Sequence, residues 1–347
     1  MLEHAVTASL AGLFRHCPAT CEARPRDAPT RAAGALHIVE EMSLMRNAIR
    51  NTTVIVVTAV ITGPALRAQQ SEEGPELLVM ISIDQLRADM LDQFAPAFTG
   101  GLKRLMEEGF SYTSASHAHS KTHTAAGHAT LSTGVFPARH GIVANEWRQR
   151  SGEVWTPLYA VADVASPITG IEAMEGRSPK NLLRSGLADW VMAQDSDARV
   201  VSLSGKDRAA ITMAGKAKAE VYWLAVERLG FVTSEYYRRD YPRWIRRFNE
   251  EVMPELVADT LWEHSAPEEH RHLARADSAV YEGDGVHTTM PHTPRSEDPW
   301  VKAAWTLEMP VADRAVALLA QEAIRELELG QRGAVDLLAL SFSATDQ

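Results

Sequence analysis

The segment KTHTAAGHATLSTGVFPARHGIVANEW, residues 121–147, combines hydroxyl, imidazole and amide side chains within 27 positions. Thr124 precedes a helix-compatible stretch, residues 125–130, so the spacing predicts an N-cap whose hydroxyl lies at the positive end of a helix dipole. That end of a helix favours an anion. A threonine hydroxyl becomes a nucleophile when its pKa is lowered, which a zinc ion does by coordinating the alkoxide. Taken alone, Thr124 is better explained as an ordinary helix cap.

Four charged residues follow apolar segments of the sequence: Asp84, Lys206, Arg208 and Asp346. Lys206 and Arg208 are two positions apart, so an extended backbone would point both cations to one side, which suits a phosphate dianion. The alternative is a solvated loop in which Lys206, Asp207 and Arg208 form an internal ion pair. For Asp84 and Asp346 the alternative is capping of the next helix.

Three continuous apolar runs precede these residues and predict buried parallel strands at residues 76–83, 198–203 and 335–342. Helical spacing lies between them, at residues 85–94, 101–108, 182–194 and 311–329. This alternation predicts an α/β fold with three layers and a mostly parallel central sheet. Because ligands in such sheets bind at the carboxyl ends of the strands, the charged residues are expected to meet there.

The alternation breaks between residue 219 and about residue 310. The segment AEVYWLAVERLGFVTSEYY predicts a hairpin that turns at Leu229 and Gly230, and clustered aromatic and basic residues follow it. We interpret the range 219–310 as an inserted cap. The alternative is an ordinary surface subdomain whose aromatic residues serve packing.

Four separated segments together resemble the alkaline phosphatase superfamily, in the branch that has a threonine nucleophile. That branch contains the PafA-type phosphate monoesterases and the nucleotide pyrophosphatase/phosphodiesterases. The segments are ISIDQLRADML (81–91), THTAAGHATLSTGVFPARHGIVANEW (122–147), SLSGKDRAAI (202–211) and DLLALSFSATD (336–346). The resemblance covers the chain from about residue 76 onwards and implies an alkaline-phosphatase-like α/β/α fold.

The resemblance also implies roles for individual residues. Thr124 looks like the nucleophile that also touches a zinc ion, and Asp84 and Asp346 look like metal-binding aspartates. Asn145 resembles the asparagine that donates its amide to a phosphoryl oxygen. Lys206 and Arg208 resemble the pair that distinguishes the monoesterases. The implied cofactor is Zn²⁺, two ions per complete site, and the implied substrate is a small phosphate ester. His128 and His140 are expected to make structural hydrogen bonds.

The family completes its zinc pair with a histidine four positions after the aspartate that Asp346 resembles, then an Asp-His pair and a last histidine. The chain ends at Gln347. We therefore expect a fold truncated at its C-terminus, and a 347-residue product that is inactive or nearly so. His287 and His292 are the late histidines to consider as replacements, but their position favours cap-loop residues.

The predicted activity is hydrolysis of phosphate monoesters through a phosphothreonine. The alternative with the same Thr124 and Asn145 is a phosphodiesterase or nucleotide pyrophosphatase. A non-catalytic remnant that binds phosphate is the alternative from another class. A sulfatase is less favoured, because that branch uses a nucleophile derived from Cys or Ser.

The composition excludes other classes of function. The chain has 35 basic and 45 acidic residues and a net charge of −10, which disfavours nucleic-acid binding. A hydrophobic content of 45% is typical of globular proteins. The sequence makes no prediction of oligomeric state.

The N-terminal residues resemble a leader rather than part of the fold. Residues 1–44 carry both cysteines, Cys17 and Cys21, and are expected to be an over-called or disordered extension. Residues 45–68 combine a basic start, a short apolar centre and small residues before Gln69, which predicts a signal peptide. The mature protein, residues 69–347, is then expected to be periplasmic or secreted, with no stable membrane span.

Overall fold

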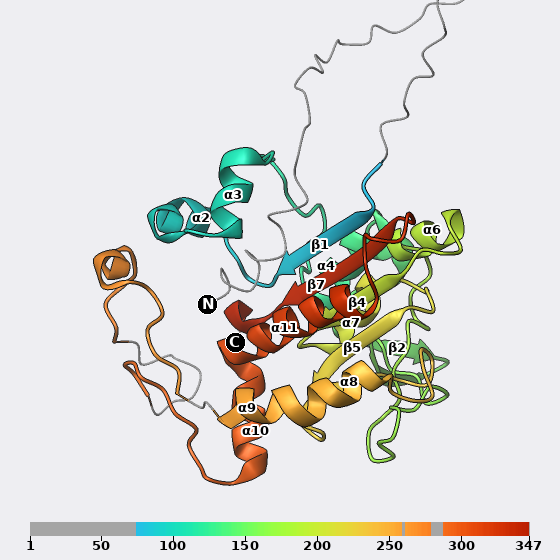
Figure 1. Cartoon of the computed structure of the whole chain (residues 1–347). Coiled ribbons are helices and arrows are strands. Elements are labelled where there is room, and N and C mark those ends of the chain that lie inside the picture. The colour runs from blue at the N-terminus through green and yellow to red at the C-terminus, as the bar shows by residue number, and fades with distance from the viewer. Residues whose placement is uncertain (1–73, 259–260, 279–286, 347) are drawn as a thin grey trace, which may run out of the picture. The chain divides into compact units, whose positions relative to one another are not determined.

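The computed structural model describes residues 74–258, 261–278 and 287–346 (Figure 1). The predicted extension and signal peptide, with Cys17 and Cys21, lie outside these residues. In the described part of the chain, none of the helices has both the length and the apolar character needed to cross a membrane.

A five-stranded sheet forms the centre of the fold. β1 (Leu77–Ile83), β7 (Asp336–Phe342), β4 (Val200–Ser204) and β5 (Glu220–Ala225) run parallel in that order, and β6 (Gly230–Val232) pairs antiparallel with β5. The three predicted strands are thus β1, β4 and β7. Because their carboxyl ends align, the residues that follow them gather at one edge of the sheet.

Helices cover both faces of this sheet (Figure 1). One face packs against α8 (Arg243–Arg247), the π-helical turn η2 (Phe248–Val252), α9 (Met253–Ala258) and α11 (Pro310–Glu326). The other packs against α4 (Thr124–Thr133), α6 (Leu187–Gln194) and α7 (Asp207–Met213). Neighbouring strand residues alternate between the two cores, with Leu338 in the first and Leu337 in the second. The predicted three-layer α/β/α fold is confirmed.

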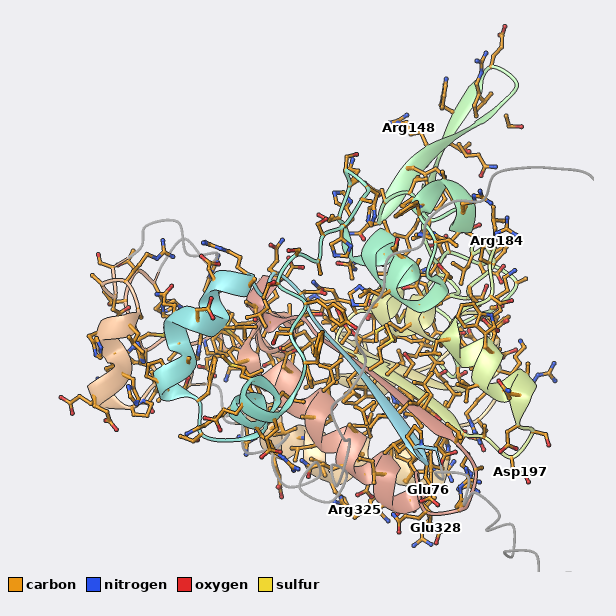
Figure 2. All side chains as sticks on the ribbon, turned by 90° about the horizontal axis from the view of Figure 1, so that it is seen from above. Glu76, Arg148, Arg184, Asp197, Arg325 and Glu328 are labelled. Atoms are coloured by element: carbon orange, nitrogen blue, oxygen red, sulfur yellow. The ribbon has the colours of Figure 1, made fainter. Side chains whose placement is uncertain are left out.

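The remaining elements connect or flank these layers. They are α2 (Ala88–Phe94), η1 (Ala95–Ala97), α3 (Gly101–Glu108), α5 (Pro137–His140), β2 (Glu146–Ser151), β3 (Val154–Tyr159), the 3₁₀ helices η3 (Glu268–Leu273) and η4 (Ala344–Asp346), and α10 (Pro299–Glu308). β2 and β3 form an antiparallel hairpin, which carries Arg148 and projects away from the sheet (Figure 2).

The range 219–310, predicted as a cap, begins inside the main sheet. The predicted hairpin forms as β5 and β6, and Leu229 at its turn has a φ of 49°. Val221 and Trp223 of β5 pack against one layer of helices while Tyr222 and Leu224 pack against the other. A strand buried on both faces is a core strand, so the structure places the start of this range in the sheet.

Candidate active site

Three of the charged residues singled out in the sequence meet at the carboxyl edge of the sheet. Asp84 follows β1, and its backbone N–H donates to the carbonyl oxygen of Phe342 at 2.9 Å. Lys206 Nζ lies 3.0 Å from Asp84 Oδ2 and also donates to a carboxylate oxygen of Asp346. The side chains of Asp84 and Lys206 are only 8% and 9% exposed. One ammonium group thus holds two carboxylates from different strand ends together.

Thr124 is the first residue of α4. The N-cap position belongs to His123, which has an extended backbone and makes no side-chain capping bond. The prediction that Thr124 is the cap is wrong by one residue, because the helical backbone conformation already includes it. Its side chain is partly exposed, and its hydroxyl makes no hydrogen bond to any residue that the structure describes. The hydroxyl therefore stays available at the end of the helix that favours anions.

His128 connects Thr124 to the strand ends. Its Nδ1 lies 2.8 Å from the carbonyl oxygen of Thr124, and its Nε2 lies 2.9 Å from Ser341 Oγ and 3.5 Å from Asp84 Oδ1. Burial lowers the pKa of His128, although Asp84 opposes that shift, so the ring is neutral at pH 7. A carbonyl only accepts, so Nδ1 carries the proton and Nε2 accepts from the Ser341 hydroxyl.

Asn145 lies beside the first turn of α4. Its Oδ1 accepts a hydrogen bond from the backbone N–H of Ala125 at 2.9 Å. Within the described chain its Nδ2 has no partner, so the amide donor is free to bind a ligand. Asn145 immediately precedes β2, and its carbonyl oxygen accepts from the N–H of Ala160 just beyond β3.

Lys206 and Arg208 differ from the predicted arrangement. The backbone is extended only at Lys206, because α7 begins at Asp207. Lys206 contacts Asp84 and Asp346, whereas Arg208 Nη1 lies 3.4 Å from the hydroxyl of Tyr159. The start of a helix between them thus gives the two cations different neighbours.

Asp313 was not predicted as part of the site. It lies in α11, is 2% exposed, and its two carboxylate oxygens accept from the backbone N–H groups of Ser343 and Ala344 at 2.7 and 3.0 Å. Burial raises its pKa. These bonds hold the turn that carries Asp346. The sequence feature that could have revealed Asp313 is an acidic residue on the otherwise apolar face of a predicted helix.

The histidines have the structural roles expected of them. His140 Nε2 lies 3.0 Å from Thr130 Oγ1, and its Nδ1 accepts from the N–H of Ile142 at 3.2 Å. Burial, with a smaller effect of His119, lowers the pKa of His140 to about 4. His287 stacks on His292, and the backbone of His292 pairs with Trp262. The ring and backbone contacts of these two histidines do not join them to Asp84, Lys206 and Asp346, which we call the strand-end cluster.

Two carboxylates face one another at the edge of the sheet, across the ammonium group of Lys206. Asp84 and Asp346 already converge on a single positive group, and carboxylate oxygens are ligands of divalent metals. Among residues 74–258, 261–278 and 287–346, however, there is no group of three or more His, Cys, Asp or Glu side chains arranged to hold a metal. The described residues therefore do not make up the pair of zinc sites that the sequence resemblance implies.

Comparison with known proteins identifies the family. Residues 78–347 match the family described as type I phosphodiesterase / nucleotide pyrophosphatase. The chain belongs to this family. Within it the chain is of the PafA type of the alkaline phosphatase superfamily, as the sequence resemblance implied.

Three of the similar proteins show the extent of the similarity. Alkaline phosphatase PhoV of Synechococcus elongatus is 32% identical, covering 80% of this chain and 51% of that protein. A protein named calcium-transporting ATPase from Myroides odoratus is 32% identical, covering 85% and 55%. Alkaline phosphatase PafA of Elizabethkingia meningoseptica is 28% identical, covering 78% and 51%. The chain thus spans about half the length of the curated relatives it matches.

The fold is shared with PafA. The crystal structure of wild-type PafA superposes with a TM-score of 0.72 at 28% identity, covering 78% of this chain and 53% of that one. A PafA variant with a threonine, an asparagine, a lysine and an arginine substituted also gives a TM-score of 0.72.

Proposed function

We propose that this chain supplies the nucleophile and the phosphate-binding groups of a phosphate monoesterase that works through a phosphothreonine at Thr124. The observation that carries this proposal is the unbonded hydroxyl of Thr124 at the start of α4, beside the free amide donor of Asn145. A helix N-terminus and an amide donor together suit the oxygens of a phosphoryl group.

In the proposed reaction, the Thr124 oxygen attacks phosphorus in line with the leaving oxygen. The bond between phosphorus and the leaving oxygen breaks, and its electron pair stays on the leaving oxygen. The leaving oxygen then takes a proton from water, while the proton of the Thr124 hydroxyl goes to solvent. Water then cleaves the phosphothreonine and restores the hydroxyl. Asn145 and Arg208 act by holding the phosphoryl oxygens, since phosphoryl transfer depends mainly on positioning and electrostatics.

We also propose that Asp84, Asp346 and Thr124 bind one divalent cation, zinc in the family that the sequence resembles. Such an ion would lower the pKa of the Thr124 hydroxyl. Lys206 Nζ, which now bridges the two carboxylates, would then be released toward a bound phosphate. The described residues offer no ligand set for a second zinc ion.

The comparison with PafA supports the choice of residues. In the solved PafA variant, the substituted threonine and asparagine are 21 positions apart and the lysine and arginine are two apart. Thr124 and Asn145 have the same separation in this chain, and so do Lys206 and Arg208. The residue types and their order also agree.

The experiment that tests the proposal measures phosphorylation as well as turnover. The chain is incubated with 4-nitrophenyl phosphate and a divalent cation, quenched in acid and digested, and its peptides are analysed by mass spectrometry. Little or no turnover is expected of the 347-residue chain, but the first step alone would leave one phosphoryl group on Thr124, and none there in the Thr124→Val variant. The matched control is Thr122→Val, an exposed threonine in the preceding loop. Labelling that survives Thr124→Val would overturn the assignment.

A second candidate is a phosphodiesterase or nucleotide pyrophosphatase, which the description of the matching family favours. A diester carries one negative charge fewer than a monoester and would gain less from Lys206 and Arg208. Hydrolysis of bis(4-nitrophenyl) phosphate in preference to the monoester, unaffected by Arg208→Ala, would favour this candidate. Phosphate binding without labelling of Thr124 would instead indicate a non-catalytic phosphate-binding protein.

We further propose export to the periplasm or outside the cell, because residues 45–68 have the pattern of a signal peptide. The substrate is proposed to be a small phosphate ester, with no nucleic-acid partner. N-terminal sequencing of the protein recovered from the periplasm or medium tests the cleavage before Gln69.

A further inference from the structure

Arg208, one of the proposed phosphate-binding groups, is held at one end and open at the other. Its Nη1 lies 3.4 Å from the Tyr159 hydroxyl, and its side chain is 23% exposed. Its Nε is buried and has no hydrogen-bond partner among the described residues. A guanidinium group has five N–H donors in a rigid fork, so most of this fork is unused.

Asp207 lies next to Arg208 in sequence, but its shorter side-chain contacts are with other residues. Its Oδ1 accepts from the Tyr159 hydroxyl and from the backbone N–H of Arg208, both at 2.6 Å, and its Oδ2 accepts from Arg177 Nε at 2.7 Å. Arg208 Nη1 is 3.9 Å from the same carboxylate. The ion pair of Asp207 with Arg177, at 2.7 Å, is thus much shorter than its pair with Arg208.

Arg177 and Tyr159 hold one another in place. The Arg177 guanidinium lies 4.9 Å from the centre of the Tyr159 ring, and its Nη1 pairs with Glu175 at 2.9 Å. Burial and the neighbouring Asp207 raise the pKa of Tyr159, so its hydroxyl keeps its proton at neutral pH. A protonated phenol can donate to Asp207 and accept from Arg208 at the same time.

The hairpin of β2 and β3 ties this group to Asn145. Tyr159 is the last residue of β3 and pairs with Glu146, the first residue of β2. Asn145 directly precedes that pair, and its carbonyl oxygen accepts from the N–H of Ala160 at 2.8 Å. The base of one hairpin thus carries the amide donor of Asn145 on one strand and the anchor of Arg208 on the other.

We propose that Tyr159, Asp207 and Arg177 form a positioning group that orients the Arg208 guanidinium and keeps it out of a close ion pair with Asp207. The group thereby favours doubly charged phosphate over a singly charged diester. The inference rests on the proposed function, because it deepens the role of Arg208 there. Tyr159 itself is a positioning residue: it acts on the ligand through Arg208.

The test measures binding, so it does not depend on turnover. Inorganic phosphate and dimethyl phosphate are titrated into the chain at pH 8 by calorimetry. We expect Tyr159→Phe to raise the Kd for inorganic phosphate by about 3- to 10-fold, since one hydrogen bond to a charged group is lost. Dimethyl phosphate should be affected less than twofold. The matched control is Tyr236→Phe, whose hydroxyl donates to the carbonyl oxygen of Lys216 away from these residues.

A double-mutant cycle separates positioning from a merely structural role. In the Arg208→Ala background, Tyr159→Phe should have no further effect on phosphate binding, because the group it orients is gone. Arg177→Gln, which frees Asp207 to pair with Arg208, should weaken phosphate binding as Tyr159→Phe does. Thermal melting of each variant checks that it folds. A variant that keeps the melting temperature of the native protein but shows the expected loss of phosphate affinity supports the proposal.

Three outcomes would overturn the inference: no binding of phosphate by the native chain, no loss on Tyr159→Phe, or an undiminished loss in the Arg208→Ala background. Failure of the proposed function looks different. If Thr124 is never phosphorylated while the double-mutant cycle behaves as expected, the positioning group stands and the hydrolytic chemistry does not.

Discussion

Asp313 holds the backbone N–H of Ser343 at 2.7 Å, so a buried carboxylate in α11 determines where the chain turns after β7. Asp346 lies three residues further on, in η4. The position of this candidate metal ligand therefore depends on a residue that lies outside the strand-end cluster.

Asp313→Ala is expected to lower the free energy of unfolding by about 2 to 3 kcal/mol, because the buried N–H of Ser343 and the partly buried N–H of Ala344 lose their acceptor. Urea denaturation measures the change. Asp298→Asn is the control: Asp298 caps α10 through its side chain, and asparagine caps equally well, so that variant should stay within about 0.5 kcal/mol of the native protein. An equal loss in both variants would contradict the role given to Asp313.

His140 makes stability depend on pH. Its pKa is lowered to about 4 in the folded protein, against about 6.5 unfolded. Neutral His140 is therefore favoured in the folded state, and its contribution to the free energy of unfolding is fully present above about pH 6.5. That contribution is lost as the pH falls toward 4, by up to about 3 kcal/mol. In His140→Gln this part of the pH dependence should disappear. Unfolding midpoints in urea between pH 4 and 7 give the measurement, and His123→Gln, in an exposed position, is the control.

Lys206→Met should leave Asp84 and Asp346 as an uncompensated pair of carboxylates. Without metal we expect a loss of about 3 kcal/mol in stability, and with a divalent cation a recovery of most of it. Thermal melting with and without millimolar Zn²⁺ or Mg²⁺ tests this expectation. Lys103→Met removes an exposed lysine and should change neither value. A variant that is destabilised equally with and without metal would argue against a cation site at this edge.

Ser341→Ala removes the hydroxyl that donates to His128. The Nε2 atom of His128 is then buried without a donor, which costs about 1 to 2 kcal/mol. In the native protein, nitrogen NMR of the histidine ring should show the proton on Nδ1. A proton on Nε2 would contradict the hydrogen-bond direction that the Thr124 carbonyl imposes.

The sequence predicted the strands well because each is a continuous apolar run that ends in polar residues. β1 and β7 begin one residue later than predicted, and β4 begins two residues later. The first residue of α4 was harder to predict from the sequence. Whether Thr124 or His123 is the N-cap depends on backbone angles that composition does not determine. The place of β5 in the main sheet was not predicted, because a hairpin pattern in the sequence does not reveal whether the hairpin belongs to the main sheet or to an insertion.

The ion-pair and hydrogen-bond partners of the site residues could be identified only from the fold. The triplet of Lys206, Asp207 and Arg208 allowed an internal ion pair, and Arg208 does lie 3.9 Å from Asp207. The shorter ion pair of Asp207, however, is with Arg177, which lies 30 positions earlier. Tyr159 and Asp313 reach the site only because a hairpin and a helix bring them there. The residues that the sequence singled out carry strong local patterns, whereas those that orient them are recognised only by distance in space.

β7 lies between β1 and β4, and its pairing with β1 joins residues 77–83 to residues 336–342. While the ribosome makes the chain, β1 must wait for some 250 residues before its partner exists, which takes about 10 to 50 seconds at ordinary translation rates. Assembly of the sheet, and with it the meeting of Asp84 and Asp346, is therefore a late event in biogenesis, and an exposed early strand would give a chaperone time to bind.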